Sequence, residues 1–241
     1  MPKTAGIVLV GNELLSGKIV DVNAAYLCRE LRELGVEVRR MAVIPDEIDI
    51  IAPTVRAFSD EFDIVFTSGG VGPTHDDVTI EGVARAMGVG VVRHPALVAL
   101  LERYYGNALT EAALRMAEVP DGAELVAGTV RFPTVLMRNV YVLPGVPEIF
   151  RQKFEALRER FRDVPFHLRC VFVRIGEGTL AAHLNELLAD FPALMLGSYP
   201  EFSNPEYRVK VTLESRDGTY LEDALGRFLA RLPTDAVVKV T

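Results

Sequence analysis

The sequence has few cysteines, no long apolar run and no cluster of basic residues, and each absence excludes a class of protein. Its two cysteines, Cys28 and Cys170, lie far apart and share no motif. A disulfide-stabilised secreted scaffold is therefore excluded, and a reducing compartment is expected. Because no run of eighteen apolar residues occurs, we expect no transmembrane helix and no membrane partner.

Positive charge is also scarce, with a formal net charge of −7 and basic residues interspersed with acidic ones, as in residues 29–33. Neutralising a nucleic-acid backbone requires clustered Lys and Arg, so we exclude nucleic acid as the main partner. The apolar segment 7–10 is too short for the core of a signal peptide and is typical of a first strand. We therefore expect a cytoplasmic protein.

Strand and helix patterns alternate through the first part of the chain. Apolar or alternating segments predict strands at 6–10, 36–44, 63–67, 135–137 and 139–143, and amphipathic segments predict helices at 21–34, 46–58, 79–87 and 148–161. This order predicts a three-layer α/β/α fold with a mostly parallel sheet. Residues 95–117 have helical patterns in two pieces.

After residue 165 the pattern changes. It predicts strands at 167–175, 207–215 and 236–240, with helices at 178–190 and 219–232. We therefore expect two domains, a ligand-binding α/β domain at 1–165 and a smaller α+β domain at 166–241.

The strongest functional signal is the segment 67–79, Thr-Ser-Gly-Gly-Val-Gly-Pro-Thr-His-Asp-Asp-Val-Thr, which follows an apolar strand and leads into a helix. In open parallel sheets ligands bind at this position, and glycines let several backbone N–H groups approach one anion. We expect Thr79 to be the helix N-cap. The loop residues expected to bind a phosphate ligand are Ser68, Gly69, Gly70, Gly72, Thr74 and His75.

Two carboxylates, Asp76 and Asp77, follow this glycine loop directly. Carboxylates beside a phosphate are unfavourable unless a cation bridges them, so the pair predicts a divalent metal site. The alternative is that one aspartate only caps the turn. For His75, a binding or bystander role is favoured over a catalytic one.

Other polar residues follow the neighbouring strands and reach the same edge of the predicted sheet. Glu13 is a candidate catalytic residue, either as a ligand contact or as an acid behind the ligand contacts that orients water, and a solvated surface position is its alternative. Asp46 is a candidate catalytic residue or only a helix cap. The remaining candidates for substrate binding are Gly11, Asn23, Pro144 and Gly145, the last two also being explained by a structural turn.

Three motifs together resemble a known family: Gly11-x-Glu-Leu-Leu-x-Gly17 with Asn23, Gly69-Gly-Val-Gly-Pro-Thr-x-Asp-Asp77, and Leu143-Pro-Gly-Val-Pro147. They are similar to the molybdopterin-binding-like domain of competence/damage-inducible protein A, here in a stand-alone form. The His75 variant most resembles the same domain of eukaryotic FAD synthase. The resemblance implies the fold shared with molybdopterin adenylyltransferase and a homo-oligomer, dimer favoured and trimer possible. It also implies that Asp77 and Asp46 match acidic positions tied to catalysis.

The resemblance further implies a metal-dependent hydrolase of a nucleotide pyrophosphate such as ADP-ribose or FAD, releasing AMP. The expected cofactor is Mg²⁺, Mn²⁺ or Co²⁺, with potassium also linked to the activity. Two alternatives remain open. One is binding or adenylylation of molybdopterin in molybdenum cofactor metabolism, and the other is a non-catalytic nucleotide-binding module.

Overall fold

The computed structural model describes residues 2–126, 132–233 and 235–241, and these form two compact units, residues 1–163 and 164–241. In these ranges no helix combines the length and apolar character needed to cross a bilayer.

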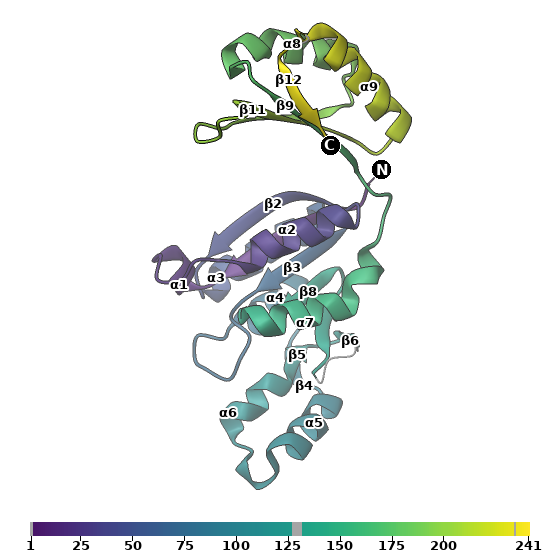
Figure 1. Cartoon of the computed structure of the whole chain (residues 1–241). Helices are drawn as coiled ribbons and strands as arrows, with labels where there is room; N and C mark the ends of the chain where they lie inside the picture. The colour runs from purple at the N-terminus through teal and green to yellow at the C-terminus, as the bar shows by residue number, and fades with distance from the viewer. Residues whose placement is uncertain (1, 127–131, 234) are drawn as a thin grey trace. The chain divides into compact units, whose positions relative to one another are not determined.

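The first unit is built on a six-stranded sheet with the strand order β2-β1-β3-β8-β7-β6 (Figure 1). Its strands are β1 (Thr4–Val10), β2 (Glu37–Ile44), β3 (Ile64–Ser68), β6 (Glu124–Val126), β7 (Thr134–Met137) and β8 (Val140–Leu143). Strands β2, β1, β3 and β8 are parallel, and β7 and β6 complete the sheet in antiparallel pairing. The mostly parallel sheet predicted from the sequence is thereby confirmed.

Helices cover both faces of this sheet, as the apolar strands require. Their bounds are α1 (Asn12–Leu15), α2 (Asn23–Glu33), α3 (Ile48–Glu61), α4 (Thr79–Met87), α7 (Pro147–Leu157) and the 3₁₀ turn η3 (Arg158–Phe161). On one face Ile7 and Phe66 pack with α2 and α7, including Phe150 and Phe154. On the other face Val8 and its neighbours pack with α3 and α4. The three-layer α/β/α arrangement follows.

A helical insert, residues 95–117, lies between α4 and the antiparallel part of the sheet. It comprises α5 (Pro95–Tyr105), η1 (Gly106–Ala108), α6 (Glu111–Leu114) and η2 (Arg115–Ala117), and a two-stranded sheet of β4 (Val91–Arg93) and β5 (Glu118–Pro120) joins its ends. The insert has its own small core, in which Leu97 and Leu101 pack with Val119. The insert is therefore a packed substructure and not an irregular loop.

The second unit has a four-stranded antiparallel sheet, β10-β11-β9-β12, with two helices packed on it. Its elements are β9 (His167–Val173), α8 (Glu177–Asp190), β10 (Met195–Pro200), β11 (Val209–Ser215), α9 (Gly218–Arg231) and β12 (Val237–Val240). The sequence pattern missed β10, because Leu196-Gly197-Ser198-Tyr199-Pro200 lacks a clear apolar alternation.

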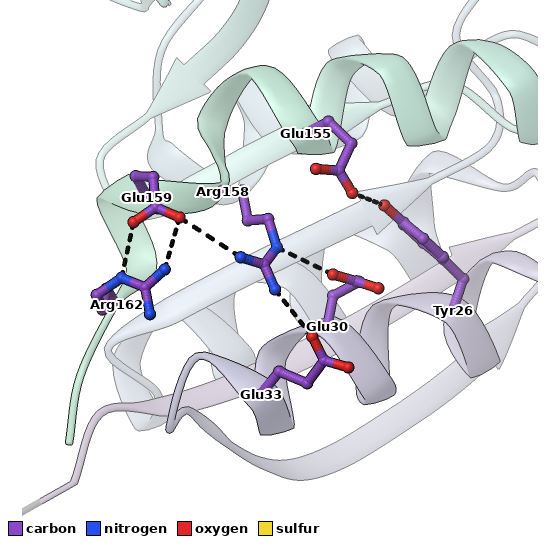
Figure 2. Close-up of polar contacts among 7 residues, drawn as sticks. All are labelled: Tyr26, Glu30, Glu33, Glu155, Arg158, Glu159 and Arg162. Atoms are coloured by element: carbon purple, nitrogen blue, oxygen red, sulfur yellow. Dashed lines mark hydrogen bonds and ion pairs between the residues drawn. The ribbon is translucent and has the colours of Figure 1, made fainter. Parts of the chain in front are cut away.

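A set of polar contacts joins α2 to α7 and η3 in the first unit (Figure 2). Arg158 contacts Glu30 at 3.0 Å and Glu33 at 2.9 Å, both on α2, and Glu159 at 3.4 Å. The hydroxyl of Tyr26 donates to Glu155 at 2.5 Å, and burial together with this carboxylate raises the pKa of Tyr26 above its ordinary value. These contacts fix the position of α7, which forms part of the candidate site.

Replacing Arg158 by Met is expected to lower the free energy of unfolding of the first unit by about 1 kcal/mol, because Arg158 and Glu30 are only 22% and 20% exposed and belong to one network. Urea denaturation measures the change. Arg162→Met is the matched control, since Arg162 is 54% exposed and contacts Glu159 on its own turn. Equal losses in the two variants would show that Arg158 has no special role.

Candidate functional site

The carboxyl ends of four parallel strands meet at one edge of the sheet, and each is followed by a loop that carries predicted site residues. Because β2, β1, β3 and β8 run in the same direction, the residues after Ile44, Val10, Ser68 and Leu143 share this edge. The loops carry Asp46, then Gly11 and Glu13, then residues 69–77, and finally Pro144 and Gly145.

The backbones of three of these loops touch directly at Gly69. Its φ is +102°, and a Cβ atom built there would lie 2.1 Å from the carbonyl oxygen of Val10. A Cβ atom on Gly145 would lie 3.3 Å from Cα of Gly69, whose N–H donates to the carbonyl of Leu143 at 3.3 Å. The contact therefore requires glycine both for conformation and for space.

Asn23 and Ser68 lie beneath this contact and hold the loops together. The side-chain amide of Asn23 donates to Oγ of Ser68 at 3.1 Å and to the carbonyl of Gly145 at 2.8 Å. Both side chains are buried, being 4% exposed. Each was predicted to bind substrate, and the structure gives both a bracing position under the loops.

Thr79 is not the N-cap of α4, contrary to the prediction. It is the first residue of the helix, Val78 occupies the cap position, and no side chain caps it. Instead, Oγ1 of Thr79 donates to the carbonyl of Gly69 at 2.8 Å, while its N–H donates to the carbonyl of Gly70 at 3.0 Å. The threonine hydroxyl is drawn away from the helix end because it satisfies a buried carbonyl of the glycine loop.

The N–H groups of Gly70, Val71 and Gly72 have no hydrogen-bond acceptor within the described part of the chain. All three residues line a cavity of about 750 Å³. Three consecutive free N–H groups in a glycine loop are the kind of donor set that binds an anion.

Asp76 and Asp77 converge on one hydroxyl group. Oγ1 of Thr74 lies 2.6 Å from Oδ1 of Asp76 and 2.5 Å from Oδ2 of Asp77, and the N–H of Thr74 also donates to Asp77 at 2.8 Å. The hydroxyl bond lowers the pKa of Asp76. One hydroxyl proton serves only one carboxylate at a time, and Asp77 keeps the N–H of Thr74 as a donor when the hydroxyl donates to Asp76.

These two aspartates fit a hard divalent cation by their donor type, since Mg²⁺ is commonly held by one or two carboxylates together with ligand phosphates. In the part of the chain that the structure describes, no third His, Cys, Asp or Glu joins them to form a larger ligand group. The side chain of His75 is 97% exposed and lies 3.9 Å from Asp76.

Only some of the predicted residues line the cavity. Gly70, Gly72, Asp77 and Pro144 line it, together with α4, the helical insert, β7 and α7. Asp76, Thr74, His75 and the residues at the Gly69 contact (Asn23, Ser68, Gly69 and Gly145) do not. Gly11, Glu13 and Asp46 lie instead around α1. Oδ2 of Asp46 accepts from the N–H of Asn12 at 2.8 Å, so Asp46 binds the start of α1 and not of its own helix. A Cβ atom on Gly11 would lie 2.5 Å from the Glu13 carboxylate, which folds over this glycine.

Within the described residues three basic side chains line the cavity, and none of them was predicted: Arg85, which pairs with Asp49, Arg115 and Lys153. Arg115, in η2, donates to the carbonyls of Thr74 at 2.5 Å and Asp77 at 3.3 Å, and so joins the insert to the glycine loop. Lys153, on α7, donates to the carbonyls of Phe132 at 2.9 Å and Pro133 at 2.7 Å and is 8% exposed. Burial lowers the pKa of Lys153 to about 8.

The sequence contains a signal for Lys153 but none for Arg115. Lys153 occupies the apolar stripe of α7, between the buried Phe150, Phe154 and Leu157, where a charged residue is exceptional. Arg115 lies in a short irregular segment whose position cannot be read from periodicity.

We expect Gly69→Ala to lower the free energy of unfolding by more than about 2 kcal/mol, because the methyl group would collide with the carbonyl of Val10 at a strained φ. Gly90→Ala is the control, since a Cβ atom there meets nothing within 4 Å and no positive φ is needed. Urea denaturation compares the two variants, and equal stability would contradict the close contact.

Lys153 predicts a pH dependence of stability. Between pH 8 and its ordinary pKa of 10.5, Lys153 binds a proton in the unfolded chain but not in the folded one. The free energy of unfolding of the wild type minus that of Lys153→Met is therefore expected to rise by about 2 kcal/mol from pH 7.5 to pH 10. Urea midpoints at both pH values test this, and a difference that does not change with pH would contradict the buried charge.

The comparisons with known proteins agree with this architecture. Residues 6–163 match a family model described as a probable molybdopterin binding domain, and residues 165–241 match the middle domain of FAD synthase. A protein of Archaeoglobus fulgidus is 39% identical over 92% of this chain and 95% of its own length. A probable FAD synthase of Caenorhabditis elegans is 31% identical over 91% of this chain, which spans 48% of that protein.

Among solved structures, the protein CinA of Thermoplasma acidophilum, described as of unknown function, is 33% identical, with a TM-score of 0.61 over 67% of this chain and 100% of that one. A CinA-like protein of Frankia casuarinae is 41% identical over 59% of this chain and 36% of its own length. The sequence-based resemblance is thus confirmed, and the chain belongs to the family of the molybdopterin-binding domain, followed by a module of the FAD synthase middle-domain type.

Proposed function

We propose that this protein is a metal-dependent hydrolase that cleaves the phosphoanhydride of an ADP-ribose- or FAD-like nucleotide and releases AMP. The observation that carries the proposal is the row of free N–H groups of Gly70, Val71 and Gly72 on the wall of the cavity, next to Asp77. An anion binds these donors, and the carboxylate beside it requires a cation.

The loop residues bind and orient the ligand phosphates in this proposal. The N–H groups of the glycine loop hold phosphate oxygens, and Asp76 and Asp77 hold the divalent ion that the resemblance implies. Such an ion neutralises charge on the phosphates and makes the phosphorus more electrophilic. Potassium remains an expectation from the resemblance. Thr74 keeps the two carboxylates oriented through its hydroxyl group.

Glu13 is the better of the two predicted acids for orienting water. Neither of its carboxylate oxygens has a hydrogen-bond partner within the described residues, whereas Asp46 already accepts from Asn12. Glu13 lies at α1 and not in the cavity wall, so it takes this role only if the anhydride lies at the shared sheet edge between the glycine loop and α1. There the water oxygen attacks one phosphorus, the anhydride bond breaks, and the proton of the water passes to the carboxylate of Glu13. The products are AMP and the second phosphate monoester.

Two further properties belong to this proposal. Exposed apolar side chains around α1 and the edge strand β2, namely Leu15, Ile19, Val20, Met41 and Val43, support self-association. That a dimer is favoured over a trimer remains an expectation from the resemblance. The free thiols of Cys28 and Cys170 support a cytoplasmic location.

Binding or adenylylation of molybdopterin is the second candidate, and the match of residues 6–163 to a molybdopterin-binding domain favours it. The same donors would hold the pterin phosphate. Tight binding of molybdopterin without pyrophosphatase activity would select this candidate. Ligand-induced thermal stabilisation by nucleotides without turnover would select a non-catalytic binding module.

The test is AMP release from ADP-ribose, FAD and NAD with Mg²⁺, Mn²⁺ or Co²⁺, with and without K⁺. We expect metal-dependent turnover that falls at least about 100-fold in Asp77→Asn. Asparagine retains an acceptor for the N–H of Thr74, so the variant keeps this loop contact while the charge is lost.

The control variant is Asp223→Asn, which removes an exposed carboxylate of the second unit. It is expected to keep the wild-type rate. If folded, metal-supplied wild type releases no AMP from any of the three compounds, the hydrolase proposal is wrong.

A further inference from the structure

Lys153 is a buried positive charge without a negative partner. Its side chain forms part of the cavity wall and is 8% exposed, yet no carboxylate in the described residues forms an ion pair with it. Among the other cations of the wall, Arg85 has a counter-ion, since it lies 2.6 Å from Asp49. Arg115 binds two loop carbonyls but is less buried than Lys153.

The two carbonyls that Lys153 contacts do not neutralise its charge. They accept hydrogen bonds at 2.9 and 2.7 Å, which leaves the third N–H of the ammonium group without an acceptor in the described residues. A buried ammonium group is costly unless it is paired. A purely structural tie between α7 and residues 132–133 does not require a charge facing a cavity.

The wall around Lys153 is apolar and aromatic. Phe132 lies 5.8 Å from the ammonium group, Ile149 precedes Lys153 by one turn of α7, and the insert contributes Leu101 and Tyr105. The glycine loop contributes its free N–H groups to the same cavity. The cavity thus has two positive sites with apolar walls, which suits a ligand with an aromatic ring.

We infer that Lys153 binds a negatively charged or carbonyl oxygen of the ligand, in addition to the phosphate held by the glycine loop, and so determines which ligands the cavity accepts. This oxygen belongs either to a second phosphate or to the oxygen-bearing edge of a ring. The inference rests on the proposed function in one respect, namely that the ligand phosphate binds at the glycine loop. It does not require that the ligand is hydrolysed.

Four probes that the protein cannot hydrolyse at an anhydride separate the two sources: FMN, riboflavin, AMP and α,β-methylene-ADP. Their dissociation constants are measured by calorimetry with the full chain and Mg²⁺, in the wild type, Lys153→Met and Lys153→Arg. The charge control is Arg85→Met, because Arg85 lies in the same wall but already has Asp49 as its counter-ion. Circular dichroism verifies that each variant is folded.

We expect Lys153→Met to weaken the binding of at least one probe about tenfold or more, Lys153→Arg to restore part of it, and Arg85→Met to change it less than about threefold. Loss for FMN and riboflavin, with AMP and α,β-methylene-ADP unchanged, identifies a ring oxygen. Loss for α,β-methylene-ADP, with AMP and riboflavin unchanged, identifies an oxygen of the second phosphate.

Three outcomes would overturn the inference. One is that every probe binds Lys153→Met within about threefold of the wild type, and another is that no probe binds the wild type at millimolar concentration. The third is an equal loss for all four probes that Lys153→Arg does not restore, which would show a structural role. Binding through Lys153 without AMP release would refute only the hydrolase, whereas AMP release with unchanged binding in Lys153→Met would refute only this inference.

Discussion

The contact between Gly69 and the carbonyl of Val10 is the constraint on which the candidate site depends. Two parallel strands end side by side, and the chain leaving β3 crosses the end of β1 at a distance that excludes any side chain. Once Gly69 is fixed, its carbonyl is held by Thr79, which starts α4, and Gly145 packs against it from β8. The positions of the loop, the helix and the third strand end therefore follow from one backbone approach.

The free N–H groups of the glycine loop result from this arrangement. A loop that crosses a strand end cannot join the sheet, so Gly70, Val71 and Gly72 find no acceptor there, and within the described residues the insert, which lines the same cavity, supplies none either. Arg115 binds carbonyls of the loop and so does not compete with a ligand for these donors. The fold thus keeps its unsatisfied donors together on one wall, where a ligand can satisfy them.

The sequence predicted those parts of the site that local chemistry specifies. Strand and helix periodicity gave the parallel sheet, and parallel strands bring their following loops to one edge, so the glycine loop and its aspartates could be found. Contacts between distant segments could not be predicted. Asp46 binds α1, Thr79 binds the carbonyl of Gly69, and Arg115 binds carbonyls of the loop. These hydrogen bonds depend on packing that periodicity does not encode. Thr79 shows that a residue typical of a helix cap can instead donate its hydroxyl hydrogen bond to a buried carbonyl, here that of Gly69.

The ammonium group of Lys153 is, like the N–H groups of the glycine loop, a polar group that the fold leaves without a full set of partners in the described residues. The rigid position of α7, fixed by Arg158 and its acidic partners on α2, places a lysine where the helix should be apolar. Rigid packing prevents the ammonium group from turning to solvent, and the carbonyls of Phe132 and Pro133 hold it without neutralising it. A charge that the fold neither exposes nor pairs lowers the stability of the free protein. In the inferred complex a ligand oxygen on Lys153 reverses this cost, so part of the affinity that we infer for the cavity originates in the instability of its unliganded state.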